Sequence, residues 1–163
     1  MARTTKPIPE GLHTVTPHLV IRDAARAIDF YKRAFGAEEI MSLKGPGGKI
    51  GHAELKIGDS VIFLADEFPQ ASCKAPQTLG GTSCTLNLYV ADVDTSFERA
   101  LKVGAKTTMP VADMFWGDRY GTLTDPFGHS WALATHKEDL SAQEIEDRAK
   151  AFWESMERQA KSA

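Results

Sequence analysis

The two halves of the chain repeat one pattern, and this repeat constrains the fold more than any other feature of the sequence. Residues Thr16–Asp23 (TPHLVIRD) match Thr85–Asp92 (TLNLYVAD) at a shift of 69 residues, from 16 to 85. Further along, Ile57–Ser60 (IGDS) matches Phe127–Ser130 (FGHS) at a shift of 70. A near-constant shift over most of a chain predicts two copies of one supersecondary unit that pack together.

Hydrophobic periodicity gives the content of the first copy. Residues 13–21 alternate and contain β-branched side chains, which predicts a strand, and Asp23 is placed to cap the helix that follows. Residues 24–35 have helical spacing of apolar side chains, and Tyr31 lies on this buried stripe. After a glycine-rich turn, residues 49–57 and 61–65 have strand patterns.

The second copy follows the same order. Residues 82–90 predict a strand, and either Asp92 or Asp94 is placed to cap a helix that ends at Gly104. We then expect a loop through residues 109–115. A strand near residues 119–124, a turn and a strand at 131–135 complete the copy. Both halves therefore predict a β-α-β-β-β unit.

These patterns predict an α+β fold in which two tandem βαβββ modules form a cupped, barrel-like mixed sheet. We place the first module at residues 12–68, a linker at 69–81 and the second module at 82–136. An amphipathic helix is expected at 141–160, because Ser141 and Glu144 form a capping box ahead of an apolar stripe. This stripe must pack against the body of the protein or against a second subunit.

Composition excludes several classes of protein. The net charge is −3 and charged residues make up 25% of the chain, so the basic surface of a nucleic-acid-binding protein is absent. The sequence contains no stretch of about 18 apolar residues, so no membrane span is predicted. The opening residues have no apolar signal segment, and Cys73 and Cys84 are expected to be free thiols. We therefore expect a cytoplasmic protein that binds neither nucleic acid nor membrane.

Four segments together resemble a known superfamily: residues 23–39, 52–67, 88–105 and 116–133. Their F-Y-x-x-x-F-G helix end and D-P-x-G-H turn are similar to those of the glyoxalase/bleomycin-resistance/extradiol-dioxygenase proteins, also called vicinal oxygen chelate proteins. The chain looks closest to the PhnB-like branch. The resemblance implies paired βαβββ modules that curl into a cup, small-molecule ligands and a homodimer.

The resemblance also implies where a metal would bind. Metal-dependent members carry His, Gln or Glu at four strand positions, which correspond here to Thr16, Thr85, either Ile62 or Phe63, and Ala132. None of these side chains is a usual ligand for a divalent cation. We therefore expect that the metal site has been lost and that the protein uses no cofactor.

A relocated metal site is the alternative. His18 lies two residues after Thr16 and shares its face of the strand, and His52 and Glu54 share a face of theirs. These three side chains would suit Zn²⁺ or Ni²⁺ if the strands bring them together. Otherwise they form a polar wall of the pocket.

The candidate pocket residues are those whose parity or residue type places them in the cup. They are Thr16, His18, His52, Glu54, Thr85, Asn87, Trp116, Arg119 and Tyr120. Trp116 would stack on a flat ligand and Arg119 would bind an anionic group. The structural alternative is that Arg119 pairs locally with Asp118 while Trp116 closes one end of the sheet.

The strand after the D-P-x-G turn has a clear division of side chains. We expect Trp131 and Leu133 on the helix side, and Ala132 and Ala134 on the cup side, where they leave room for a ligand. His129 lies in the turn and is expected to be exposed.

Three functions follow from these residues. The first is metal-free binding of a small organic molecule by a homodimer. The second is an enzyme of the same superfamily, a lyase, isomerase or dioxygenase-like protein, with His18 or Glu54 as the acid/base group or with the relocated metal. The third is an interaction module whose binding face is the terminal helix.

Overall fold

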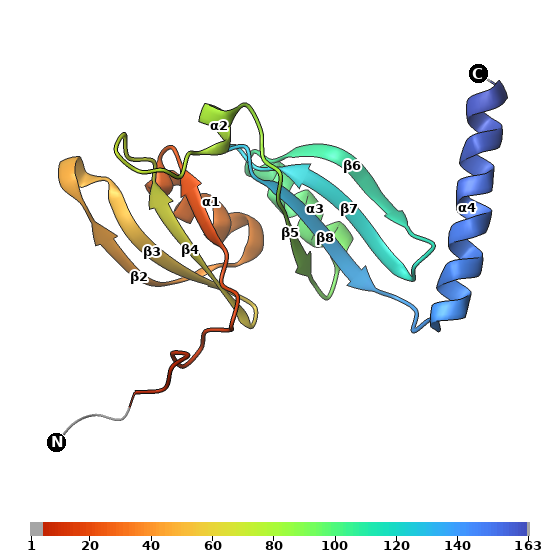
Figure 1. The fold of residues 1–163 in the computed structure, drawn as a ribbon, viewed down its shortest axis with the longest axis horizontal. Helices are drawn as coiled ribbons and strands as arrows, with labels where there is room; N and C mark the ends of the chain where they lie inside the picture. Colours follow the sequence, from red (N-terminus) through yellow and green to blue (C-terminus); the bar gives the residue numbers. More distant parts are fainter. Residues whose placement is uncertain (1–4, 163) are drawn as a thin grey trace.

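A computed structural model describes residues 5–162, and its elements follow the predicted order twice (Figure 1). The first module contains β1 (His18–Ile21), α1 (Ala24–Phe35), β2 (Glu38–Lys44), β3 (Ile50–Ile57) and β4 (Ser60–Asp66). The second contains β5 (Thr85–Tyr89), α3 (Val93–Lys102), β6 (Lys106–Asp113), β7 (Asp118–Thr124) and β8 (Ser130–His136). A 3-10 turn at Pro46–Gly48, a short helix α2 (Pro76–Leu79) between the modules and a terminal helix α4 (Ala142–Ser162) complete the described chain.

Each module forms its own four-stranded mixed sheet, with strand orders β1-β4-β3-β2 and β5-β8-β7-β6. The first strand runs parallel to the last in both modules, and the register is equivalent: His18 lies opposite Phe63, and Asn87 lies opposite Ala132. The predicted α+β fold with tandem βαβββ modules is confirmed. The expectation of one barrel-like sheet is wrong, because β1 and β5 are edge strands of two separate sheets.

The sequence patterns indicated no strand at residues 38–44, where the mostly exposed edge strand β2 lies, and two strand boundaries also differ from the prediction. The first strand begins at His18 rather than at residue 13, and it follows Pro17, which has no N–H to donate to a ladder. The second difference is β6, which occupies residues 106–113, although a loop was expected through residues 109–115. It is an edge strand that is mostly exposed, so it lacks an alternating apolar pattern, and such a strand tolerates Pro110.

Each long module helix is capped as the repeat predicts. Asp23 caps α1 by accepting a hydrogen bond from the backbone N–H of Arg26. Of the two candidates for α3, Asp92 is the cap and accepts from the N–H of Thr95.

The last strand of each module also holds the first turn of the helix. The buried Asp66 carboxylate accepts from the N–H groups of Asp23 and Ala24, both at 2.9 Å, and from that of Ile50 at 2.7 Å. In the second module Thr135, 69 residues later, accepts from the N–H of Val93 at 2.8 Å. The two modules therefore use a carboxylate and a hydroxyl for the same contact.

The two modules share one apolar core, and its centre is aromatic. Tyr31 of α1 is fully buried, as predicted, and its ring lies 5.3 Å from that of Trp131 in the second module. Phe35 lies 4.5 Å from Trp131. The helices are joined directly, because Arg99 of α3 donates to the carbonyl of Ala34 in α1 at 2.7 Å. Helix α1 therefore packs against its own sheet and against the other module.

A buried carboxylate lies beside this aromatic centre. Asp125 accepts from the hydroxyl of Tyr31 at 2.7 Å and from the indole N–H of Trp131 at 2.9 Å. Its other oxygen accepts from the backbone N–H groups of Phe127 and His129. Burial, together with the Asp125 charge, raises the pKa of Tyr31, so the phenol stays protonated and keeps donating.

Helix α4 begins at the predicted capping box. The Glu144 carboxylate accepts from the backbone N–H of Ser141 at 2.8 Å, and the Ser141 hydroxyl accepts from the N–H of Glu144. The rest of the helix stands away from the two sheets (Figure 1). Two of its side chains contact the second module: Arg148 pairs with Glu138 at 2.9 Å, and the ring of Phe152 lies 5.2 Å from that of Phe115.

The apolar stripe of α4 is largely uncovered. Phe152 is 38%, Trp153 59% and Met156 47% exposed. Within residues 5–162, no helix has the length and apolar character needed to cross a membrane.

We predict that Asp125→Ala lowers the free energy of unfolding by about 3 kcal/mol or more, because four donors lose their acceptor and at least two of them are buried side chains. Urea denaturation measures this loss. Asp92→Ala is the matched control, since it removes an exposed helix cap worth about 1 kcal/mol. Equal losses in the two variants would show that Asp125 contributes only a local turn.

Candidate functional site

One face of the first sheet carries a row of chemically useful side chains. His18 of β1 lies opposite Phe63 of β4, Phe63 opposite Glu54 of β3, and Glu54 opposite Met41 of β2. Residues of the alternate parity, such as Leu55 and Leu64, are buried in the core with α1. The row therefore lies on the face turned away from the helix, which we name the first open face.

His52 joins this row from the same strand as Glu54. Its Nε2 lies 3.2 Å from a Glu54 carboxylate oxygen, and its ring centroid lies 4.9 Å from that of Phe63. The ring of His18 lies 6.2 Å from both rings. Partial burial, together with the nearby His52, lowers the pKa of His18, so His18 is neutral at neutral pH. The structure thus brings together three predicted site residues around Phe63.

The equivalent face of the second sheet, the second open face, is built from small and hydroxyl-bearing side chains. Asn87 lies opposite Ala132, and Ala132 opposite Thr122. The predicted residue Thr85 donates a hydrogen bond to the Ser130 hydroxyl at 3.1 Å on the neighbouring strand. As predicted, Trp131 and Leu133 are buried in the core, but Ala132 and Ala134 are also buried, at 0% and 1% exposed, so the expectation that they leave open room for a ligand is not met.

Asp118 organises the end of the second open face. Its buried carboxylate accepts from the Tyr89 hydroxyl at 2.9 Å and from the indole N–H of Trp116 at 3.1 Å. The other oxygen lies 2.8 Å from Nδ1 of His136. The ring of Trp116 lies 5.5 Å from that of Tyr120. Trp116 is therefore held in place by Asp118 and presents an aromatic wall with Tyr120.

The sequence prediction did not give Asp118 this role. The alternation of side chains along the strand could have indicated this role, because Asp118 and Tyr120 are two residues apart on β7 and share a face. The carboxylate was instead considered only as a partner for Arg119.

The expectation that Arg119 binds an anion in the cup is not met. Arg119 is adjacent to Tyr120 on the strand and therefore lies on the opposite face, beside α3. Its guanidinium makes two hydrogen bonds to Asp94, at 2.6 and 2.7 Å, and one to Asp113 at 3.1 Å. These carboxylates raise the pKa of Arg119 and occupy three of its five N–H donors. The local pairing with Asp118 is not observed either.

Two further expectations are corrected. His129 is buried rather than exposed, because its turn folds against the first module and its ring forms a hydrogen bond with the backbone of Val20. Thr16 precedes β1 instead of lying within it, and its hydroxyl contacts the carbonyl of His13 at 3.4 Å. Thr16 is therefore not part of either open face.

The residues at the family's four metal positions do not fit a metal ion. The register resolves the uncertain position as Phe63, the partner of His18, so the four side chains are two threonines, a phenyl ring and the methyl group of Ala132. A divalent cation needs imidazole, carboxylate or thiolate donors. Across residues 5–162, no cluster of three or more His, Cys, Asp or Glu side chains is arranged to hold a metal ion. The relocated site at His18, His52 and Glu54 is therefore not formed within one chain.

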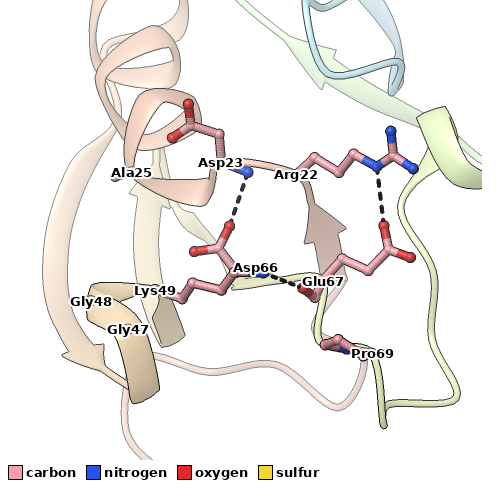
Figure 2. A pocket seen from close by; sticks show the side chains of 9 residues that line it. All are labelled: Arg22, Asp23, Ala25, Gly47, Gly48, Lys49, Asp66, Glu67 and Pro69. Atoms are coloured by element: carbon pink, nitrogen blue, oxygen red, sulfur yellow. Dashed lines mark hydrogen bonds and ion pairs between the residues drawn. The ribbon is translucent and has the colours of Figure 1, made fainter.

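A separate hollow of about 570 Å³ lies at the start of α1 (Figure 2). Its charged groups already satisfy one another. Asp66 accepts from the first N–H groups of the helix, Arg22 pairs with Glu67, and Lys49 donates to the carbonyl of Glu67 at 3.0 Å. The chain's own carboxylate therefore occupies the helix N-terminus, where an anionic ligand would otherwise bind.

Comparisons with known proteins agree with this architecture. Residues 11–133 match the model of the Glyoxalase/Bleomycin resistance protein/Dioxygenase superfamily. The uncharacterized protein Mb0911c of Mycobacterium bovis is 45% identical over 135 residues, which cover 81% of this chain and 89% of that protein. The crystal structure of TioX from Micromonospora sp. ML1 is 30% identical and covers 76% of this chain and 98% of its own, with a TM-score of 0.61. The PhnB protein from Bacillus cereus is 20% identical, with a TM-score of 0.60 over 76% of this chain and 99% of its own, and shows the same fold.

We predict that His136 stabilises the protein in a pH-dependent way. Hydrogen bonds from its ring to Asp118 and Asp139 raise its pKa above the ordinary value of 6.5. A raised pKa in the folded state stabilises fully below about pH 6.5, and this stabilisation is lost as the pH rises through the folded-state pKa. The midpoint of urea denaturation of His136→Ala should therefore lie further below that of the wild type at pH 6 than at pH 9.

Asp139→Asn provides the control, because it removes one of the two carboxylates and should reduce the pH-dependent part of the loss. A His136→Ala penalty that is the same at both pH values would mean that the ring acts through packing alone.

Proposed function

The chain belongs to the glyoxalase/bleomycin resistance protein/dioxygenase superfamily, and we propose that it binds a small organic molecule on its two open faces without a metal ion. The observation that carries this proposal is Phe63, a phenyl ring at a family metal position, with two imidazoles and a carboxylate around it. This arrangement offers a ring for stacking and polar groups for orientation. Such a combination is typical of a small-molecule site.

The first open face provides most of the polar recognition. Neutral His18 has one ring nitrogen that donates and one that accepts, and Glu54 accepts hydrogen bonds beside it. Phe63 and the two imidazole rings form an aromatic surface on which a flat group can stack. A flat ligand with both a donor and an acceptor fits these groups.

The second open face supplies neutral anchors and a further aromatic wall. The small, buried Ala132 lies between Asn87 and Thr122, and Trp116 and Tyr120 lie at one end. Thr85 and Asn87 are exposed and available as neutral anchors. The proposed ligand site therefore comprises the predicted residues except Thr16 and Arg119.

We also propose a homodimer of the PhnB-like branch. His18 and Asn87 on the two faces are exposed and His52, Glu54 and Tyr120 are half-buried, and a face open to water cannot enclose a ligand. The exposed Phe152, Trp153 and Met156 add an apolar surface of the kind that marks protein interfaces. A second copy that meets these surfaces would close the ligand site, and the partners of the chain would be this copy and the ligand.

An acid/base enzyme is the second candidate function. The contact between His52 and Glu54, at 3.2 Å, resembles the pairing of a general base with a group that orients it. Turnover of a bound molecule, lost in Glu54→Gln, would favour this candidate over simple binding.

We predict that a panel of indole, quinoline and naphthol derivatives contains a compound that raises the melting temperature and binds with one molecule per chain. Phe63→Ala should weaken that binding about tenfold, because it removes the stacking surface. Glu54→Gln should weaken it, whereas Glu98→Gln on the exposed side of α3 should not. Titration calorimetry measures each affinity.

Metal ions provide the opposing test. Elemental analysis of untagged protein after exposure to Ni²⁺, Zn²⁺, Mn²⁺ and Fe²⁺ should find no stoichiometric metal. Stoichiometric metal that is lost in His18→Ala or His52→Ala would contradict the metal-free proposal.

We predict that Trp153→Asp converts the dimer to a monomer, because a charge replaces a large apolar side chain at the uncovered stripe. Light scattering coupled to size-exclusion chromatography measures the mass. Lys150→Asp, on the same helix but outside the stripe, is the control and should remain dimeric. A wild-type protein that stays monomeric at high concentration would refute the dimer.

A further inference from the structure

The first open face carries an exposed apolar patch beside the polar groups of the proposed site. Met41 lies opposite Glu54 and Leu43 opposite His52, so these two side chains of β2 share the face of the candidate site residues. Met41 is 37% and Leu43 54% exposed. Phe63, two strands away from β2, is half-buried on the same face. We name Met41, Leu43 and Phe63 the sheet patch.

The stripe of α4 is a second exposed apolar surface. Phe152, Trp153 and Met156 lie within about one and a half turns of the helix, and each is more than a third exposed. The ring contact with Phe115 and the ion pair of Arg148 fix the helix to the second module. These contacts hold α4 in place while Trp153 and Met156 stay exposed.

The stripe and the sheet patch lie at opposite ends of the molecule. Figure 1 shows β2 at one end of the long axis and α4 at the other. The two surfaces of one chain therefore do not meet in this structure. Two chains related by a two-fold axis bring them together twice, because the stripe of each chain then lies on the sheet patch of the other.

The areas of the two surfaces suit such a pairing. At about 200 Å² for a large side chain, the exposed parts of the stripe and of Met41 and Leu43 amount to roughly 500 Å². A two-fold dimer contains this contact twice, so these side chains alone supply about the 1,000 Å² expected of a stable interface.

The charge of α4 favours a protein over a membrane as the occupant of its stripe. The helix carries five acidic and four basic side chains. Helices that lie on membranes have an excess of Lys and Arg on the polar face, which attracts anionic lipids. A second copy of the chain offers an apolar surface without that requirement.

We propose that α4 of a second copy lies across the first open face, and that Trp153 of this copy forms the second wall of the ligand site. The inference rests on the function proposed above, because it names the group that completes the same site. A flat ligand would be held between the ring of Phe63 and an indole from the other chain, instead of stacking on one side only. Helix α4 thus takes part in ligand binding as well as in assembly.

Crosslinking between two different chains tests this arrangement without a ligand. One protein carries Leu43→Cys and the other, which has an added mass tag, carries Met156→Cys. Both also carry Cys73→Ser and Cys84→Ser, so each has a single thiol. After mixing, a short bismaleimide should join one chain of each kind. Glu98→Cys in place of Leu43→Cys is the matched control and should give no such product, because Glu98 lies on the exposed side of α3.

Complementation tests whether Trp153 contributes to the site of the other chain. Phe63→Ala and Trp153→Ala should each weaken the binding of 2-naphthol about tenfold, as measured by fluorescence titration. A mixture of the two variants should regain sites of wild-type affinity, because one site of the mixed dimer combines an intact Phe63 with an intact Trp153. The control mixture, Phe63→Ala with His52→Ala, should regain none, since both changes affect the same face.

The outcomes separate this inference from the proposed function. Melting temperatures show that each variant folds. Failure of Leu43→Cys and Met156→Cys to crosslink between chains would overturn the proposal. A mixture of Phe63→Ala and Trp153→Ala that binds no better than its components would overturn it as well. Crosslinking in a protein that does not bind 2-naphthol would support the interface and count against the proposed function.

Discussion

The buried carboxylate of Asp125 fixes the relation between the two modules, and the rest of the structure depends on that relation. A buried charge is tolerated when hydrogen bonds replace its water, and here two side chains and two backbone groups donate to the carboxylate. Tyr31 comes from the first module and Trp131 from the second. The carboxylate therefore joins α1 to the second sheet.

The internal repeat preserves the backbone, while the side chains at equivalent positions have diverged. Asp66 and Thr135 both bind the first turn of their module's helix, so a carboxylate and a hydroxyl are interchangeable there. On the open faces the change has more effect. Phe63 corresponds to Ala132, so the centre of the first face is aromatic, whereas the centre of the second carries only a methyl group. A ligand that touches both faces would therefore be bound in one orientation.

The sequence was sufficient to predict the modules, because periodicity and repetition depend on local geometry that the sequence records directly. The caps at Asp23 and Ser141 were predictable for the same reason, since each is a local hydrogen bond. Strand β6 was missed because an exposed edge strand has no apolar alternation to detect.

The site was predicted less well because its contacts are long-range. Parity correctly placed His18, His52 and Glu54 on one face, and it would have placed Arg119 with α3 had it been applied to β7. The burial of His129 follows from the packing of one module on the other, which no local pattern reveals. Strand register decides whether side chains on neighbouring strands can bind one metal ion. The sequence left either Ile62 or Phe63 at one of the family's metal positions, and the register in the structure identifies Phe63.

In the metal-free binding that we propose, apolar burial and stacking must supply the binding energy. A divalent ion contributes strong and directional attraction to a ligand oxygen, and a phenyl ring at the same place contributes only burial and stacking. Apolar burial provides roughly 25 cal/mol per Å², so a ligand needs contact on most of its surface to reach micromolar affinity. One open sheet face can cover only one side of a flat molecule. The second side must therefore be covered by the other open face, by α4 or by another copy of the chain, and for this reason we connect ligand binding with the uncovered aromatic side chains of α4.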